Sequence, residues 1–484
     1  KRQGMKMEKL LNELSSESRP AYSVNSDVEI DVQIPENLKR SSGLDLPSIT
    51  ENDLSRHFTN LSRKNYALST SFYPLGSCTM KYNPLINERI AKNEAFNFIH
   101  PYQPAKSMQG VLKIMYELEK DLCEISGMDC FSLQQAAGAH GEFTGLLIIA
   151  KYFKSIKQKR TKIIVPDTAH GTNPASAAFA GFGIVPLKSE SDGSILPEKL
   201  KEFLTSDIAA VMLTIPNTLG AFEKNISEIS RIVHENGSLL YYDGANLNAI
   251  MGIVRPGDMG FDVMHINLHK TFSTPHGGGG PGSGPVGVKE FLEPFLPVPK
   301  IESSKSKFVL NYKKPKSIGK LKAFFGNLPV ILKAYVYIKS LGAEGLKNAS
   351  EWAVLNANYM LARFKDKIDV PAGNRCMHEF VLSPKSLFKN NVRTLDVAKR
   401  LLDYGYYAPT VYFPLIVEEA VMIEPTETES KETMDAFVDT FIKIISEEAA
   451  QDPQKLKDAP FNTSVGRLNE VEAARNPVLK WKKA

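Results

Sequence analysis

Short aliphatic runs alternate with amphipathic segments through the middle of this chain, and that alternation restricts its fold more than any other feature. The runs predict buried strands at 162–166, 208–215, 238–242, 263–268 and 285–288. The amphipathic segments between them predict helices at 141–158, 197–206 and 225–236. Strands that alternate with helices are typical of a mostly parallel sheet covered by helices. We therefore expect an α/β fold around a mainly parallel sheet.

The two ends of the chain differ from the middle in composition and in the periodicity of their apolar residues. Residues 1 to about 110 are polar and rich in proline, with little sustained periodicity, which favours an extended arm that wraps other parts. We then expect a helix at 111–126, ended by Gly127. The C-terminal part predicts helices across 328–341, 344–365, 394–404 and 431–450 and a strand at 379–382.

These differences in sequence pattern predict that the chain is divided into three regions. They are an N-terminal arm over 1–110, a large α/β domain over 111–340 and a smaller C-terminal α+β domain over 341–484. A length of 484 residues is enough for such an arrangement with a sizeable core.

Charge and cysteine usage exclude several classes of protein. The 59 Lys and Arg residues nearly balance 54 Asp and Glu residues, so we expect no nucleic-acid partner. The cysteines are scattered without a C-x-x-C pair, which argues against a disulfide scaffold or zinc ribbon and favours a reducing cytoplasm. The N-terminal residues lack the apolar core of a secretory signal, and no apolar run approaches the roughly 20 residues that span a bilayer. We expect a soluble, cytoplasmic protein without a membrane partner.

The most informative window surrounds Lys270. An apolar strand is expected to deliver His269 and Lys270 at its end, and six of the eight residues from Gly277 to Gly284 are glycine. A lysine at the end of a buried strand suits a covalent imine with an aldehyde cofactor, because a desolvated amine is the nucleophile that such chemistry needs. This window alone is equally compatible with a surface lysine at a strand end.

A second window favours the cofactor. The run SLLYYDGAN predicts a buried strand that ends in Asp243, 27 residues before Lys270. Pyridoxal phosphate enzymes need a carboxylate against the pyridine nitrogen and a lysine for the Schiff base. A helix cap or a metal ligand could also explain Asp243, but neither explains the lysine. The pair therefore predicts a pyridoxal phosphate site.

Two further windows fit the same cofactor. The stretch QAAGAHGE, from Gln135 to Glu142, has the small residues that a phosphate cradle needs, ahead of an expected helix whose dipole favours an anion. His170 follows the strand at 162–166 and could stack on the cofactor ring, although a lone histidine is more often structural. Each signal is weak alone and gains weight beside the other windows.

Other chemistries fit the sequence poorly. His265 and His269 are four apart in a β-like run without the Glu of H-E-x-x-H, so a zinc protease is not expected, and we predict no metal. The glycine run lacks both the P-loop and the dinucleotide-binding patterns. The lysine-rich stretch 300–322, with Glu302 as its one acid, favours a solvated loop, with a docking surface for an acidic partner or phosphate as the alternative.

Several longer windows resemble a known family. They are FYPLGSCTMKYNP (72–84), AAGAHGE (136–142), DTAHGTNPASA (167–177), YYDGANLN (241–248), RPGDMGFDVMHINLHKTFSTPHGGGGPGSGPVGV (255–288) and MIEPTETES (422–430). In this order they resemble the P-protein family of the glycine cleavage system, and within it the subunit 2 chains of glycine dehydrogenase (decarboxylating).

The resemblance implies a fold type I pyridoxal phosphate-dependent enzyme that decarboxylates glycine and transfers the aminomethyl group to the lipoyl disulfide of H-protein. It also implies a related subunit 1 as obligate partner, in an α2β2 heterotetramer. Another fold type I activity, an aminotransferase or amino-acid decarboxylase, stays open as the alternative. A non-catalytic scaffold subunit is not expected, because Lys270 is present.

The resemblance also implies roles for individual residues. Lys270 matches the Schiff-base lysine, Asp243 the pyridinium partner and His170 the residue over the ring. The turn at 137–139 matches the phosphate side, and His269 and Thr271 are expected near it. Three residues of the N-terminal arm are expected to approach the site without an assigned role: Tyr73, Ser77 and Cys78.

Overall fold

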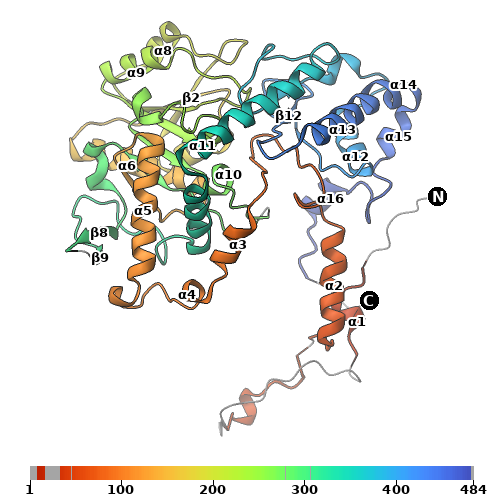
Figure 1. The fold of residues 1–484 in the computed structure, drawn as a ribbon, viewed down its shortest axis with the longest axis horizontal. Coiled ribbons are helices and arrows are strands. Elements are labelled where there is room, and N and C mark those ends of the chain that lie inside the picture. The colour runs from red at the N-terminus through yellow and green to blue at the C-terminus, as the bar shows by residue number, and fades with distance from the viewer. Residues whose placement is uncertain (1–7, 17–32, 45, 278, 306, 481–484) are drawn as a thin grey trace.

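The fold is a large α/β body joined to a smaller C-terminal domain, with an N-terminal region whose first part projects from them (Figure 1). This is a computed structural model, which describes residues 8–16, 33–44, 46–277, 279–305 and 307–480. Among these residues, no helix combines the length and the apolar character needed to cross a membrane.

A seven-stranded sheet forms the centre of the large domain. Its order is β1-β7-β6-β5-β4-β2-β3, and β7 alone runs antiparallel to its neighbours. The bounds are β1 Cys130–Ser132, β2 Lys162–Pro166, β3 Gly183–Leu187, β4 Ile208–Thr214, β5 Leu239–Gly244, β6 Val263–Ile266 and β7 Val286–Val288. All five expected strands are present. The sequence missed β1, which has three residues, and the edge strand β3, which is mostly part-exposed and contains Pro186.

Helices cover both faces of this sheet. They are α5 Gln109–Ser126, α6 Gly138–Ser155, α7 Thr172–Phe179, α8 Pro197–Phe203, α9 Ile226–Glu235 and the short α10 Leu268–Thr271. Successive strand residues enter opposite cores: Ile163 packs in the cluster with α6, whereas Ile164 packs in the cluster with α5 and α9. Two buried faces explain why the central strands read as continuous apolar runs.

The long helix α11, Leu328–Phe364, connects the two domains. It breaks at Gly342 (φ 64°, ψ −173°), so it corresponds to the two helices expected at 328–341 and 344–365. Ile338 before the break belongs to the large core, and Ala357 after it belongs to the small-domain core.

The small domain is built on a three-stranded antiparallel sheet in the order β10-β12-β11. Its strands are β10 Phe380–Leu382, β11 Thr410–Val411 and β12 Val421–Ile423. Its helices are α12 Thr394–Asp403, α13 Lys431–Ile442 with a π-helical continuation Lys443–Glu448, α14 Ala449–Gln451, α15 Pro453–Asp458 and α16 Glu470–Arg475. Short 3-10 turns elsewhere are Glu36–Leu38, Ala105–Ser107, Leu247–Ala249, Pro256–Met259, Glu290–Phe295 and Pro384–Leu387.

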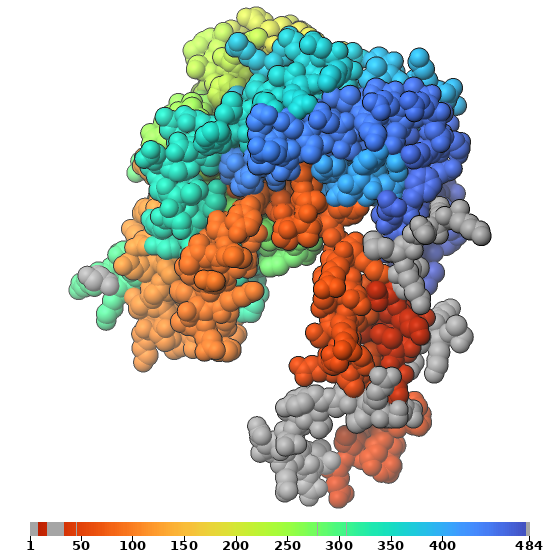
Figure 2. Space-filling view, turned by 45° about the vertical axis from the view of Figure 1, so that its right-hand side comes forward, coloured from red at the N-terminus to blue at the C-terminus, as the bar shows by residue number. Residues whose placement is uncertain are grey.

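The N-terminal region contains more helix than its sequence suggested. It forms α1 Leu11–Leu14, α2 Glu51–Arg63, α3 Leu85–Ala91 and α4 Glu94–Asn97. The helix α2 begins after Thr50, whose side chain accepts a hydrogen bond from the Asp53 N–H. It projects as a separate column beside the body (Figure 2). It buries only His57, although its sequence is amphipathic, so the sequence analysis overlooked a helical pattern in a segment that is polar as a whole. Residues 1–7 and 17–32 of the expected arm lie outside the described residues.

The lysine-rich stretch also differs from the loop that we favoured. It forms a hairpin of β8 Lys300–Ser304 and β9 Lys307–Asn311. Part of its charge is compensated, because Lys300 pairs with Glu293 at 2.5 Å and Lys314 pairs with Glu302 at 3.0 Å.

Candidate active site

The expected aspartate lies near the carboxyl end of a parallel strand, whereas the expected lysine lies on the short helix α10, just beyond the neighbouring strand, and not at a strand end as predicted. Asp243 lies near the end of β5, directly opposite His265 of β6, and β6 leads into α10, which carries Lys270. Crevices at the carboxyl ends of strands are the usual ligand sites of open α/β sheets. Lys270 is close enough for its charge to lower the pKa of Asp243 and of His170. The structure therefore brings these three expected site residues together.

Asp243 is buried and held by many donors. Its oxygens accept hydrogen bonds from Asn173 Nδ2 at 3.0 Å, Thr214 Oγ1 at 3.2 Å and the Ala245 N–H at 3.0 Å. His265 Nε2 lies 3.1 Å from Oδ1. Burial alone would raise the pKa of Asp243, but the charge and contact of His265, the Ala245 N–H and the Lys270 charge lower it to about 2. Asp243 is therefore ionised at neutral pH.

This donor set fits a pyridinium nitrogen. An ionised carboxylate offers about four lone-pair sites, and here the three hydrogen bonds and the His265 contact fill them. A ring N–H would replace one donor, and the Thr214 hydroxyl makes the longest of these bonds and can rotate. The environment thus preserves the charge that a protonated pyridine ring needs.

His170 lies just before α7. Its Nδ1 is 3.0 Å from Thr172 Oγ1, and that hydroxyl donates to Glu142 Oε1 at 2.8 Å. Its ring lies 5.4 Å from the ring of Phe413, which comes from the small domain. Burial lowers the pKa of His170, and the Lys270 charge lowers it further, so the imidazole is neutral. A neutral flat ring suits the stacking role expected for it.

The turn before α6 fits a phosphate group. Ala137 caps the helix without a side-chain hydrogen bond, and Ala137 and Ala139 are exposed around the buried Gly138. A Cβ on Gly138 would meet Asn267 Oδ1 at 2.1 Å, so the turn tolerates no side chain there. First-turn N–H groups lack intrahelical partners and favour an anion.

Two buried hydroxyl groups close to Lys270 in the sequence are also available to bind a ligand. Within the described part of the chain, the buried hydroxyls of Thr271 and Thr274 have no hydrogen-bond partner. His269 behaves differently: its Nδ1 is 3.2 Å from the Ser283 carbonyl, and burial, with the Lys270 charge, lowers its pKa to about 3. His269 is therefore neutral and contacts the glycine-rich loop, so it offers no cationic contact to an anion.

The N-terminal arm reaches the site through Ser77. Lys270 Nζ donates to the Ser77 carbonyl at 2.8 Å, and the Ser77 N–H donates to Glu379 Oε2 at 2.7 Å. Cys78 is close enough for the Lys270 charge to affect its thiol, although burial raises the pKa of Cys78 overall. Tyr73 stacks on Tyr407 with ring centres 4.1 Å apart.

Sequence reasoning missed several polar residues around Lys270. His265 was weighed only as a zinc ligand, although its place on the strand after Asp243 could have revealed their pairing. Glu379 was expected only as a strand residue, and Glu424 lies in the window 422–430 without an assigned role. Asn173 carried no signal beyond its closeness to His170.

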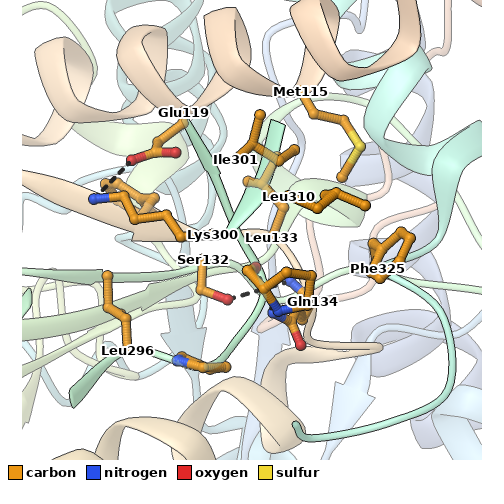
Figure 3. Close-up of a pocket in the computed structure, with 13 residues that line it drawn as sticks. Met115, Glu119, Ser132, Leu133, Gln134, Leu296, Lys300, Ile301, Leu310 and Phe325 are labelled. Atoms are coloured by element: carbon orange, nitrogen blue, oxygen red, sulfur yellow. Dashed lines mark hydrogen bonds and ion pairs between the residues drawn. The ribbon is translucent and has the colours of Figure 1, made fainter. Parts of the chain in front are cut away.

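A small pocket lies elsewhere, between α5, β1 and the β8–β9 hairpin (Figure 3). Glu119 and Lys300 meet there at 3.9 Å, and Met115 and Gln134 line other sides of the pocket. Burial raises the pKa of Glu119 despite that lysine. None of the residues that line this pocket is an expected site residue, so it is separate from the Lys270 region.

Family models match most of the chain. The model described as glycine cleavage system P-protein matches residues 23–305, and the one described as glycine dehydrogenase, C-terminal domain, matches residues 349–463. A protein of Endomicrobium trichonymphae named probable glycine dehydrogenase (decarboxylating) subunit 2 is 93% identical over 478 residues, which cover 99% of this chain and 100% of that protein. A protein of Thermotoga maritima with the same name is 54% identical, over 97% of this chain and 99% of its own length.

Solved structures agree on the fold. A glycine decarboxylase (P-protein) of the glycine cleavage system, in inhibitor-bound form, gives a TM-score of 0.71 at 20% identity, over 85% of this chain and 93% of that chain. A cysteine desulfurase from Thermococcus onnurineus gives 0.59 at 13% identity, over 78% and 95%. The fold is that of fold type I pyridoxal phosphate enzymes, as expected. The chain belongs to the glycine cleavage system P-protein family, among the subunit 2 chains of glycine dehydrogenase (decarboxylating).

Proposed function

We propose that this chain is the glycine-decarboxylating subunit of the glycine cleavage system. It uses pyridoxal phosphate to remove CO2 from glycine and transfers the remaining aminomethyl group to the lipoyl disulfide of H-protein. The arrangement of Lys270, the anionic Asp243 and the neutral His170 carries this proposal, together with family membership.

The residues present fit the cofactor. Lys270 would hold it covalently, Asp243 would face its ring nitrogen, His170 its ring and the turn at 137–139 with Thr271 its phosphate. When bound, pyridoxal phosphate supplies the electron sink that accepts the charge left by decarboxylation. The chain's own contribution is to keep Asp243 charged through His265 and to orient the Lys270 ammonium on the Ser77 carbonyl. Burial of Asp243 and His265 keeps water from weakening their interaction.

We also propose the partners and the compartment. The relatives named subunit 2 support a complex with a subunit 1. The α2β2 heterotetramer and the lipoylated H-protein as its carrier partner follow from the family resemblance. The projecting α2 supports a partner too, because it exposes Leu54, Phe58 and Leu61. All four cysteines are free thiols, which supports the cytoplasm.

The visible spectrum tests this function. We expect a cofactor band for the purified chain with subunit 1, bleached by borohydride, with the label on Lys270 in peptide maps. We also expect glycine- and H-protein-dependent exchange of labelled CO2. Label without lipoyl-dependent exchange would instead support another fold type I activity, and label on a different lysine would contradict the assigned site.

A further inference from the structure

A second group of buried carboxyls lies beside Lys270, contributed by the small domain. Strands β10 and β12 pair antiparallel, with Phe380 opposite Ile423. This register sets Glu379, just before β10, opposite Glu424, just after β12. Both are buried, as is His378, and the three side chains each offer a ligand atom within 4.8 Å of the others.

The two carboxyls differ in their hydrogen bonds. Glu379 accepts from the Ser77 N–H at 2.7 Å and from Asn246 Nδ2 at 3.2 Å, so each of its oxygens has a donor. Glu424 accepts only at Oε1, from Thr79 Oγ1 at 2.6 Å. Considering only residues that the structure describes, Glu424 Oε2 and both ring nitrogens of His378 have no hydrogen-bond partner. The cluster therefore contains buried polar atoms that have no hydrogen-bond partner among the described residues.

The charges around Glu424 favour a shared proton. Burial raises its pKa well above the usual range, and the neighbouring Glu379 raises it further. Lys270 and the Thr79 hydroxyl act in the opposite direction, and Glu427, itself paired with Lys81 at 2.7 Å, adds to the rise.

Glu379 responds in the same direction. Burial raises its pKa to about 7, against the Ser77 donor and the Lys270 charge. Two like charges this close disfavour full ionisation, so the pair retains a proton at neutral pH. The Lys270 ammonium makes the cluster a poorer site for a divalent cation than for that proton.

The proposed reaction consumes one proton. Glycine enters with its ammonium and carboxylate charges, the bond to the carboxylate carbon breaks, and CO2 leaves. The electron pair left on the methylene carbon forms the C–S bond, and the S–S bond breaks with its pair on the second sulfur. That thiolate takes up a proton to become the thiol, so every turnover needs a proton donor near the substrates.

We propose that Glu424 supplies this proton, with Glu379 as the positioning residue that keeps it on the pair. The inference rests on the proposed function and adds a proton donor to it. Glu424 is the better donor because its Oε2 is unengaged, whereas both Glu379 oxygens accept N–H bonds. His378 is a poor source of the proton, because burial and the Lys270 charge lower its pKa to about 3.

The test compares Glu424→Gln with the matched control Glu223→Gln in the complex with subunit 1. Glu223 is also a buried carboxyl with a raised pKa, but it accepts from Ile195 and Asn225 N–H groups, away from Lys270. We expect Glu424→Gln to keep the glycine-induced spectral change and to lose roughly 100- to 10,000-fold in turnover, the usual range for a lost proton donor. Infrared difference spectra of the ligand-free protein at neutral pH should show a protonated carboxyl assigned to Glu424.

Two further variants test the direction of the pH dependence. Activity should fall as the pH rises through the pKa of the donor. Glu379→Gln removes a like charge and should move this alkaline limb to lower pH, whereas Thr79→Val removes a donor to the carboxylate and should move it higher.

Unchanged turnover in Glu424→Gln would overturn the inference. So would alkaline limbs of the pH profile that do not move in opposite directions in Glu379→Gln and Thr79→Val. If Glu424→Gln does not fold, the pH shifts of Glu379→Gln and Thr79→Val test the inference by themselves. Failure of the wild-type complex to respond to glycine would instead count against the proposed function.

Discussion

Two buried carboxyl sites flank Lys270, and they are set up in opposite ways. Asp243 in the large domain has three hydrogen-bond donors and a His265 contact, and its pKa is lowered to about 2. Glu379 in the small domain has fewer donors and a carboxyl neighbour, and its pKa is raised to about 7. Both are fully buried. The comparison teaches that donors and neighbouring charges decide whether a buried carboxyl is an anion or an acid.

The largest expected effect comes from removing the cation between the two sites. Lys270→Ala should abolish covalent cofactor attachment and reduce turnover to background, because Lys270 is the lysine whose charge acts on Asp243. Borohydride labelling and the visible spectrum measure this, with the exposed Lys224→Ala as control. Retained labelling in Lys270→Ala would show that another lysine forms the link.

The next effect concerns Lys81, which neutralises Glu427 near the small-domain site. Its buried Nζ contacts Glu427 Oε1 at 2.7 Å, Asn248 Oδ1 at 2.8 Å and Tyr337 OH at 2.9 Å. Lys81→Met should lower the free energy of unfolding in urea by about 3–5 kcal/mol, the cost of an unpaired buried charge. The control Lys339→Met removes the more exposed pair with Asp121 and should cost at most about 1 kcal/mol. Equal losses of stability in the two variants would contradict the expected difference between a buried and an exposed ion pair.

The free energy of unfolding of the wild type should fall as the pH rises, because Glu379 becomes ionised in a buried place. In Glu379→Gln this fall should be absent. The folded pKa lies above the unfolded value of 4.5, so this stabilisation is present below pH 4.5 and is lost as the pH rises through about 7. A shift of this size corresponds to about 3 kcal/mol. Unfolding of the ligand-free chain between pH 4 and 8 measures it. An identical slope in wild type and variant would mean that Glu379 is ionised throughout.

Asp243→Asn should act at the acid end with the opposite sign. The folded pKa is depressed from 3.8 to about 2, so the stabilisation is present above pH 3.8 and is lost as the pH falls toward 2. Between pH 4 and pH 2, the free energy of unfolding should therefore fall by about 2 kcal/mol less in Asp243→Asn than in the wild type. Acid titration of the free energy of unfolding checks it, and a variant that matches the wild type in acid would place the charge elsewhere.

Exposed charge should matter least. Lys307, Lys313 and Lys316 are exposed on or after the β8–β9 hairpin. Changing all three to Glu should raise the KM for H-protein a few-fold at low salt and hardly at high salt, because salt screens exposed charges. The control reverses Lys154, Lys157 and Lys159, which are exposed at and after the end of α6. Equal effects of both sets would exclude a specific basic docking surface.

The large-domain site could be predicted because its parts follow local patterns. Asp243 lies near the end of one strand and Lys270 just beyond the next, on α10, and buried apolar runs reveal both strands, whose parallel order brings their ends together. The small-domain site could not, because Glu424 meets Thr79 and Glu379 only through the register of short strands and the return of the arm. The helix α2 was missed for a different reason: Leu54, Phe58 and Leu61 recur at helical spacing, but the segment as a whole is polar and was interpreted as an extended arm.

The return of the N-terminal arm has a consequence for biosynthesis. Leu75 pairs with Ile423, and Thr79 meets Glu424, 345 positions further along the chain. Residues of the arm therefore wait for residues made 345 positions later before the surroundings of Lys270 close. Contacts this distant in sequence form late in folding. A nascent chain can complete its large sheet while still on the ribosome, yet it gains a complete site only after Glu424 has been made.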